Sequence, residues 1–401
     1  MTGKAFTPLP GFPPQGEGGK RRLQGGGNNA GVFRSSIRFF WLPFWVILFV
    51  TATASAAGDE FQTARPGRVF SFPRDHGAHP EFKTEWWYWV GHLKAGGGRA
   101  FGYQLTFFRA AVRKPDPQAR SAWSFHTAYF AHLALTDPQR GTFLFREQAG
   151  RGALGLAGAE AGRLKVWVDS WQAEQEGEAT VLSARAEDLE LHLTLQPAKP
   201  PALHGEGGFS PKAAGGGHAS HYYSLTRLTT KGKLLLDGKE MEVTGLSWMD
   251  HEFFTGGLAP GQAGWDWFAL QLDDGSEVML YLLRHRDGKL DPASAGTLVD
   301  AEGRARALKL ADFQVKATGS WTSPHTGGTY PSGWEVALPG AGYRLTLSPT
   351  LADQEVRARG AARVNYWEGE MQVRGEKNGQ PLTGQGYVEL TGYAGPMEGM
   401  F

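Results

Sequence analysis

Two consecutive alternating segments restrict the fold of this chain more than any other feature. Residues 83–93 are rich in aromatic side chains, and apolar residues occupy both alternating sets of positions. A strand of this kind is expected to be covered on both faces. After a glycine-rich turn at residues 95–99, apolar residues alternate with small or polar ones over residues 101–107, as in a strand with one buried face. The two segments therefore predict a β-hairpin that carries a large aromatic wall.

Alternating segments recur along the rest of the chain without a sustained helical period, and glycine-rich turns separate them. In the first half the predicted strands span residues 125–135, 142–148, 164–170, 180–186, 189–196, 221–228 and 239–248. In the second half they span residues 265–272, 277–284, 311–319, 333–338, 343–348, 364–375 and 384–392. Such a meander closes as a barrel or packs as a sandwich, and we favour closure because it removes exposed edges.

The composition suggests where two all-β domains would meet. Residues 196–220 are rich in Pro, Gly and Ala like a linker, but the first sheet still needs the two strands that follow. We therefore place the boundary within residues 249–264, where the composition changes sharply. The N-terminal domain is then predicted to cover residues 62–254, and the C-terminal domain residues 255–401.

The N-terminal region has the parts of an export signal. Residues 1–38 are rich in Gly, Pro and Asn without an apolar period, which predicts disorder. Residues 39–57 combine an apolar run, preceded by Arg34 and Arg38, with a small-residue exit that is typical of signal peptide cleavage. The alternative is an uncleaved membrane anchor over the same residues. Cleavage predicts a periplasmic or secreted protein. Without cleavage the protein would be anchored to the membrane by this segment alone.

Overall composition excludes several classes of function. The formal net charge is +1, and no basic stripe indicates nucleic acid as a partner. The chain has no cysteine, which rules out disulfides, thiolate nucleophiles, thiolate metal sites and a lipoprotein anchor. It also lacks the G-x-S-x-G motif of many serine hydrolases.

Four groups of polar residues stand among aromatic ones and are the candidates for chemistry. They are Asp75, His76, His79 and Glu85; His126 and His132; His221, Tyr222 and Tyr223; and Asp250, His251 and Glu252 with Asp266. For each group alone, a buried hydrogen-bonding role is the more ordinary interpretation. All four lie in the first half or at its junction with the second, which favours a shared site.

The last group suits one particular reaction. Burial among aromatic neighbours raises a carboxyl pKa, and a carboxyl that stays protonated can act as a general acid. Aromatic faces stabilise a carbocation, and a base can activate water. These are the requirements for adding water to an isolated alkene, and the reaction needs no cofactor. The nearby aromatic residues are Trp248, Phe253, Phe254, Trp265 and Trp267.

A metal centre is the competing interpretation of the same residues. His76 and His79, and likewise the triplet at residues 250–252, contain nitrogen and oxygen ligands. Neither has the helical histidine spacing of a zinc hydrolase, so we predict no metal.

Several segments in order carry a family resemblance. They are DHGAHPEFKTEWWYWVGHL from residue 75, YYSLTRL from residue 222, GLSWMDHEFF from residue 245, GWDWFALQL from residue 264, YWEG from residue 366 and GYVELTGY from residue 386. Together they resemble the carotenoid 1,2-hydratase (hydroxyneurosporene synthase) and AttH-like family, also described as predicted secreted hydrolases. The resemblance covers about residue 70 to the C-terminus. It implies a tandem pair of lipocalin-like antiparallel β-barrels.

The resemblance to the hydratase branch also implies site residues. It points to His251 and Asp266 as the acid/base pair, with Asp250 beside them, although Phe253 and Gly264 depart from the hydratase pattern. The residues expected to bind the ligand are His76, His79, Glu85, Trp86, Trp87, Tyr88, His126, Tyr222, Tyr223, Trp248, Phe253 and Trp265.

Three functional hypotheses follow. The protein binds a lipophilic isoprenoid, carotenoid or acyl molecule as a carrier, or it is a cofactor-independent hydro-lyase that hydrates such a molecule. The third hypothesis is an accessory role in a periplasmic complex with a membrane transporter.

Overall fold

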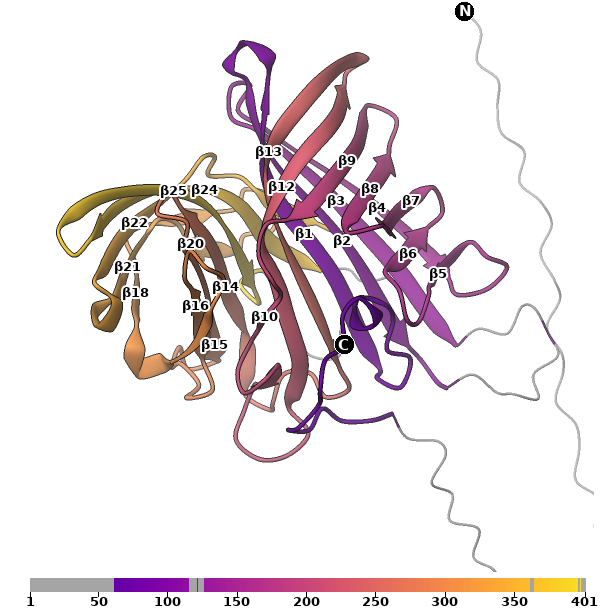
Figure 1. The fold of residues 1–401 in the computed structure, drawn as a ribbon, viewed down its shortest axis with the longest axis horizontal. Coiled ribbons are helices and arrows are strands. Elements are labelled where there is room, and N and C mark those ends of the chain that lie inside the picture. The colour runs from indigo at the N-terminus through magenta and orange to yellow at the C-terminus, as the bar shows by residue number, and fades with distance from the viewer. Residues whose placement is uncertain (1–60, 115–120, 122–125, 361–363, 396, 398–401) are drawn as a thin grey trace, which may run out of the picture. The chain divides into compact units, whose positions relative to one another are not determined.

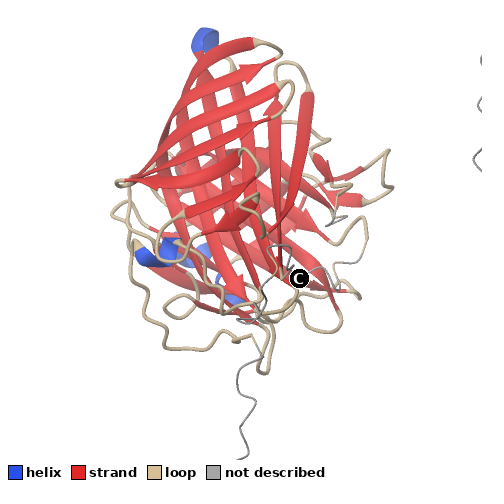
Figure 2. Cartoon of the chain, turned by 90° about the vertical axis from the view of Figure 1, so that its right-hand side faces the viewer, coloured by secondary structure: helices blue, strands red, loops and turns tan. Residues whose placement is uncertain are grey.

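Long antiparallel strands make up most of the protein, and helix is limited to short turns between them (Figure 2). The computed structural model describes residues 61–114, 121, 126–360, 364–395 and 397, which lie within one compact unit. The predicted disordered region and signal segment lie outside the described residues. Within the described residues, no helix has the length and apolar character needed to cross a membrane. The short turns are η1 (Arg74–His76), η2 (Gly96–Gly98), η3 (Leu310–Asp312) and η4 (Pro339–Ala341).

The first sheet has 13 strands and curls into a unit that we call barrel 1. Its strands are β1 (Thr84–Ala95), β2 (Ala100–Ala111), β3 (Thr127–Asp137), β4 (Thr142–Arg151), β5 (Ala157–Ala159), β6 (Lys165–Val168), β7 (Trp171–Glu176), β8 (Ala179–Arg185), β9 (Leu189–Pro197), β10 (Ala202–Leu203), β11 (Phe209–Pro211), β12 (Ala219–Leu236) and β13 (Lys239–Phe254). The order is β4-β3-β2-β1-β13-β12-β9-β8-β7-β6-β5, and β10 and β11 pair with β12. The two end strands meet closely, since a Cβ on Gly150 of β4 would lie 2.7 Å from the Cβ of Ala157 in β5.

The second sheet has 10 strands and forms barrel 2. Its strands are β14 (Gln262–Leu272), β15 (Glu277–His285), β16 (Ala295–Val299), β17 (Ala305–Lys309), β18 (Gln314–Ala317), β21 (Trp334–Leu338), β22 (Tyr343–Pro349), β23 (Glu355–Arg357), β24 (Asn365–Lys377) and β25 (Gln380–Thr391). A separate pair joins β19 (Ser320–Thr322) and β20 (Thr329–Pro331). The two curled antiparallel sheets confirm the all-β prediction of tandem lipocalin-like barrels.

Strands β5, β7, β16 and β17 were not predicted, and the differences that affect the candidate site concern β12 and β13. The predicted strands ended at residues 228 and 248, but β12 continues to Leu236 and β13 continues to Phe254. The triplet at residues 250–252 therefore lies inside a long strand and not in a loop at a barrel mouth. This difference decides which way each of its side chains points.

The aromatic strand β1 is covered on both faces, as its sequence predicted. Trp87 and Trp89 belong to the core inside barrel 1. Tyr88 and Val90 point the other way and pack in a separate cluster with residues of barrel 2, including Trp267. Figure 1 shows the two sheets side by side, and β24 and β25 contact β2 and β1. The outer face of β1 thus forms part of the contact between the barrels.

Buried ion pairs and hydrogen bonds also join the barrels. Lys199 and Arg227 of barrel 1 hold Glu277 of barrel 2 at 2.8 and 2.5 Å, and the Glu277 side chain is fully buried. The Tyr88 hydroxyl donates to Oε1 of Glu368 at 2.7 Å. Burying charged and polar groups is unfavourable unless they find partners, so each barrel stabilises the other in this arrangement.

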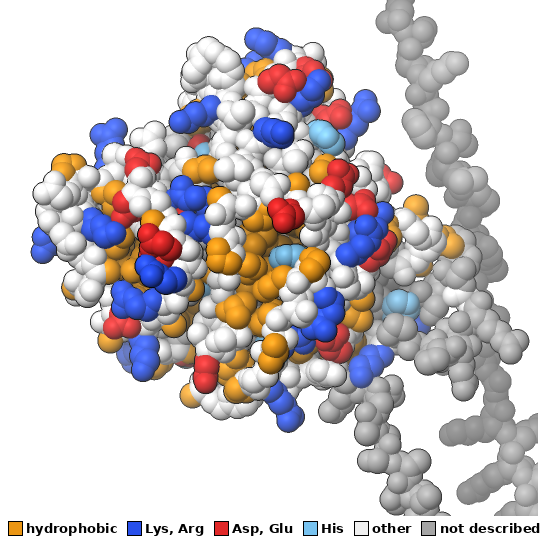
Figure 3. All heavy atoms as spheres, in the orientation of Figure 1, with side chains coloured by type: hydrophobic (Ala, Val, Ile, Leu, Met, Phe, Trp, Pro, Cys, Tyr) orange, Lys and Arg blue, Asp and Glu red, His pale blue; other side chains and the backbone are white. Residues whose placement is uncertain are grey.

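The outer surface has no strongly charged face in the view that Figure 3 gives. Hydrophobic side chains gather where Figure 1 places the labels of β1 and β10, and lysine, arginine and acidic side chains border them. This mixed surface agrees with the net charge of +1.

Candidate active site

The side chains of β13 alternate between two different environments. Asp250 and Glu252 point toward barrel 2, whereas His251 points into barrel 1, because successive strand residues face opposite sides. In the strand register, Asp250 stands next to Tyr88 of β1 and Ser224 of β12. The outer faces of β1, β12 and β13 therefore form one continuous wall at the contact between the barrels.

A cavity of about 220 Å³ lies between this wall and barrel 2, and we call it the seam cavity. Eight of the residues that line it are aromatic, and most of its lining surface is apolar. Its lining from barrel 1 includes Trp86, Tyr88, Thr106, Phe108, Ser220, Tyr222, Asp250, Glu252 and Phe254. Its lining from barrel 2 includes Trp265, Trp267, Tyr281, Leu283 and Glu389, and Lys212, Leu258 and Met397 complete it. An apolar cavity with a few polar groups is typical of a small-molecule site.

Asp250 is the most extensively hydrogen-bonded group in this cavity. Its Oδ2 accepts from the Tyr222 hydroxyl at 2.5 Å, and its Oδ1 accepts from Trp248 Nε1 at 2.6 Å and from the Ser224 hydroxyl. Trp267 Nε1 in turn donates to the Tyr222 oxygen at 2.9 Å. Burial raises the Asp250 pKa to about 7, although the three donors partly offset this effect. The group can thus gain or lose a proton near neutral pH.

Glu389 supplies a second carboxyl from the opposite barrel. It lies on β25 and accepts from Trp265 Nε1 at 2.5 Å. Burial raises the Glu389 pKa to about 7, the indole donor lowers it, and the charges of Asp250 and Glu252 raise it further. Each of the two carboxyls can therefore be protonated or charged near neutral pH, and the three donors to Asp250 favour its charged form.

Lys212 and Glu252 form an ion pair in the same cavity. The Lys212 Nζ lies 2.9 Å from Glu252 Oε1, and it stands 4.3 Å from the ring centre of Tyr281 and 5.1 Å from that of Tyr222. Burial lowers the Lys212 pKa, but Glu252 more than offsets this effect, and the net pKa is raised. Lys212 is therefore a charged ammonium group.

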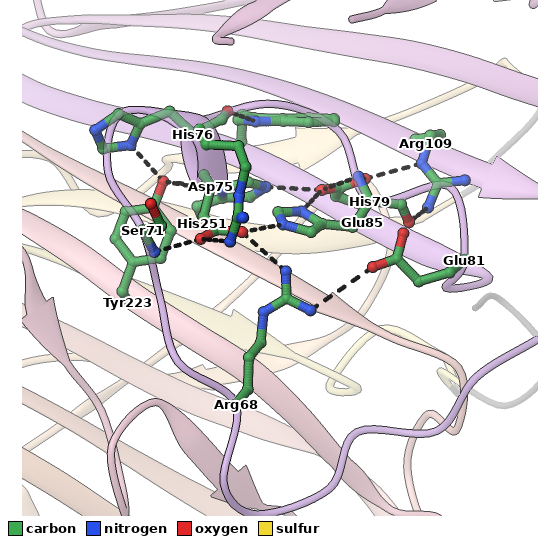
Figure 4. A network of polar contacts seen from close by, with 12 residues as sticks. Arg68, Ser71, Asp75, His76, His79, Glu81, Glu85, Arg109, Tyr223 and His251 are labelled. Carbon is green, nitrogen blue, oxygen red and sulfur yellow. Dashed lines mark hydrogen bonds and ion pairs between the residues drawn. The ribbon is translucent and has the colours of Figure 1, made fainter. Parts of the chain in front are cut away.

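The other face of β13 belongs to a buried polar network inside barrel 1 (Figure 4). Glu85 accepts from His79 Nδ1 at 2.8 Å, from His251 Nε2 at 2.9 Å and from Arg109 Nε at 3.0 Å. Burial favours a raised Glu85 pKa, but Arg109 and the two histidines outweigh it and hold the pKa well below its usual range. The Nδ1 of His251 then accepts from the Tyr223 hydroxyl at 2.9 Å. Burial lowers the His251 pKa to about 4, so this histidine is neutral.

His79, Glu85 and His251 have the spacing of metal ligands, since one ligand atom from each lies within 4.8 Å of the others. The same atoms are already hydrogen-bonded to one another. His79 Nε2 is also 3.2 Å from Asp75 Oδ1, and the positively charged Arg109 forms an ion pair with Glu85 at 3.0 Å. A cation here would have to displace these partners, so the residues fit a structural network better than a metal centre.

Comparison with known proteins assigns the family. A family profile described as AttH-like matches residues 63–393. The chain belongs to the AttH-like family. A crystal structure from Nitrosomonas europaea that bears the AttH name is 34% identical, with a TM-score of 0.75, and the match covers 83% of this chain and 100% of that one.

A second solved structure shares the fold of this AttH-like protein. The structure of kievitone hydratase from Nectria haematococca has a TM-score of 0.61 at 14% identity, and the match covers 84% of this chain and 96% of that one. Among curated protein sequences, none matches the chain.

The AttH-like fold does not bring His251 and Asp266 together. Asp266 points into barrel 2, where it accepts from Arg284 Nε at 2.8 Å and from the Tyr393 hydroxyl at 3.1 Å. His251 points into barrel 1. Strand alternation separates them. The residues next to His251 on β13 and next to Asp266 on β14 face the seam cavity, so these two side chains point away from it.

The remaining predicted site residues divide between two places. Those at the seam cavity are Asp250, Trp86, Tyr88, Tyr222 and Trp265, with Trp248 bound to Asp250. Those in barrel 1 or at its end are His76, His79, Glu85, Trp87, Tyr223 and Phe253. His126 belongs to neither group, and its Nδ1 lies 3.1 Å from the Thr127 hydroxyl.

Sequence reasoning missed six polar or aromatic residues of the cavity, which are Thr106, Phe108, Lys212, Ser220, Tyr281 and Glu389. Glu389 interrupts the apolar residues of β25, and that isolated acid was a usable signal. Tyr281 looked like an ordinary core residue of β15. Lys212 lies in the Pro- and Gly-rich segment after β11, where no pattern distinguishes it.

Proposed function

We propose that this AttH-like protein binds an isoprenoid or acyl molecule in the seam cavity and adds water to an isolated C=C bond of that molecule. One observation carries the proposal: an aromatic cavity contains two carboxyls, one from each barrel, whose pKa values burial raises to about 7. Such carboxyls exchange protons efficiently at neutral pH.

The reaction divides between the two carboxyls. Glu389 donates its proton to one alkene carbon, and the π electrons form the new C–H bond. The positive charge then lies on the more substituted carbon, where the faces of Trp86 and Trp267 stabilise it. A water molecule attacks this carbon through its oxygen. The proton it loses passes to the Tyr222 oxygen as the Tyr222 hydroxyl proton moves to Asp250, to which it is already hydrogen-bonded.

The product is a tertiary alcohol, and the two carboxyls must then return to their starting protonation states. One proton has moved from Glu389 to Asp250, and it returns through solvent before the next turnover. The fold shared with kievitone hydratase supports this reading, since that protein's name describes a water-adding enzyme.

The location of the protein is a related proposal. We place its activity outside the cytoplasm on the basis of the signal-type sequence at residues 39–57. An accessory role beside a membrane transporter stays a prediction.

A carrier without catalytic activity is the second candidate function. The observation that favours it is the mostly apolar lining of the seam cavity, which would bind an apolar molecule whether or not chemistry follows. The two functions differ only in what happens to the bound molecule.

An assay for added water separates them. The mature protein is incubated with citronellol, which has one trisubstituted alkene, and the products are analysed by mass spectrometry. We expect a product heavier by one water with the wild type, and a strong loss of this product with Glu389→Gln. Glu335→Gln, at an exposed side chain on β21, is the matched control and should retain activity. A stoichiometric complex without product would favour the carrier.

A further inference from the structure

Ser220 is a buried hydroxyl group that points into the seam cavity without a partner. It lies on β12, its exposed fraction is 1%, and it lines the cavity. Within the part of the chain that the structure describes, its Oγ makes no hydrogen bond. A buried hydroxyl without a partner is unfavourable, because it has lost its hydrogen bonds to water. A ligand that supplies a hydrogen-bonding atom at this point would replace one of these hydrogen bonds.

The Lys212–Glu252 ion pair faces the same part of the cavity. In the register of β12 and β13, Ser220 stands opposite Phe254, and Tyr222 stands opposite Glu252. Glu252 of the ion pair is therefore one cavity-facing position along the sheet from Ser220. Lysine has three N–H donors, and the described contacts of Lys212 use two, to Glu252 and to the Ser210 hydroxyl at 3.2 Å. A donor and a carboxylate acceptor thus stand beside the Ser220 hydroxyl.

This combination matches a ligand hydroxyl better than a ligand carboxylate. A hydroxyl oxygen accepts from Lys212, and its proton is donated to Glu252. A carboxylate would accept from Lys212 but would meet the negative charge of Glu252. A pure hydrocarbon would leave the ion pair and the Ser220 hydroxyl facing apolar groups, which is unfavourable.

The position of these groups relative to Asp250 sets the geometry of the ligand. Glu252 is two residues from Asp250 on β13, a separation of about 7 Å along the strand. The row of Ser220 is farther in the same direction. The oxygen function of the ligand therefore sits at the opposite end of the molecule from the alkene that reacts.

The volume of the cavity sets the size of the ligand part that it encloses. Its 220 Å³ is less than the roughly 300–1,000 Å³ of a typical drug-sized pocket. A short isoprenoid is enough to fill this space.

We infer that the substrate is a short isoprenoid alcohol whose hydroxyl group binds to Ser220, Lys212 and Glu252. This inference rests on the proposed function, because it assumes that the alkene reacts near Asp250 and Glu389. It adds the substrate class and the three residues that recognise its head group.

Binding measurements with matched ligands test the inference. Citronellol, the hydrocarbon with the same skeleton but no hydroxyl, and citronellic acid compete with a hydrophobic fluorescent dye for the intact protein. We expect the hydrocarbon to bind at least about tenfold more weakly than citronellol, since one hydrogen bond to a charged group is lost. We expect citronellic acid to bind more weakly than citronellol as well.

Variants assign the effect to the named residues. Ser220→Ala and the charge-balanced double variant Lys212→Gln/Glu252→Gln should each weaken citronellol binding several-fold and leave hydrocarbon binding unchanged. Ser183→Ala, on the exposed part of β8, is the matched serine control.

Three results would overturn the inference: equal binding of alcohol and hydrocarbon, tighter binding of the acid, or variants that weaken both ligands equally. Failure of the proposed function looks different. In that case citronellol still binds more tightly than its hydrocarbon, but neither is hydrated.

Discussion

The dependence of stability on pH gives a sharp test of the Asp250 environment. Burial raises its pKa from 3.8 to about 7, which is equivalent to about 4 kcal/mol of preference for the protonated form in the folded protein. Because the folded pKa is the higher one, this contribution is fully present below pH 3.8. It is lost progressively as pH rises through about 7.

Asp250→Asn removes this titration while keeping nearly the same shape. The free energy of unfolding of the variant minus that of the wild type should therefore increase by about 4 kcal/mol between pH 4 and pH 8. This change does not depend on the stability of the variant at pH 4. Chemical denaturation of both proteins across this pH range measures the difference. Both carry Glu389→Gln in addition, because the Asp250 charge also raises the Glu389 pKa. A difference that stays constant with pH would refute the reasoning that Asp250 is a desolvated carboxyl with a pKa near 7.

Three further predictions concern other buried carboxyls. Glu389→Gln should lower the rate of citronellol hydration about 10²–10⁴-fold with little change in binding, which single-turnover assays and dye displacement distinguish. Glu277→Ala should destabilise the protein by about 3–5 kcal/mol in urea titrations, because Lys199 and Arg227 lose their buried partner; an unchanged midpoint would show that this ion pair does not hold the barrels together. Glu85 has a lowered pKa, so its stabilising effect is present above pH 4.5 and lost as pH falls. Glu85→Gln should therefore reduce the melting temperature at pH 7 more than at pH 3, and equal losses would contradict this sign.

The sequence allowed the fold to be predicted because period-2 patterns and the family motifs agree. The aromatic strand β1 was expected to be covered on both faces, and Trp87 and Tyr88 do lie in separate clusters. What covers the outer face was not predictable. That cover is barrel 2, and contacts between residues about 180 positions apart, such as Tyr88 with Trp267, leave no local pattern.

The site was predicted only in part, because it also depends on contacts between residues that are distant in the sequence. Asp250 and Trp86 lie together at the seam cavity as expected, because β1 and β13 are neighbouring strands. His251 and Asp266 were expected to form an acid/base pair because of the resemblance to the hydratase branch. Once β13 extends through Phe254, alternation sends His251 into barrel 1, and the same alternation on β14 sends Asp266 into barrel 2.

The central claim is that the ligand binds between the barrels and not inside one of them. Photocrosslinking with a diazirine derivative of citronellol, followed by peptide mass spectrometry, locates the ligand most directly. The structure predicts labels on seam residues such as Trp86, Phe254 and Tyr281. Labels on interior residues of barrel 1, such as Leu105 and Leu193, would contradict it.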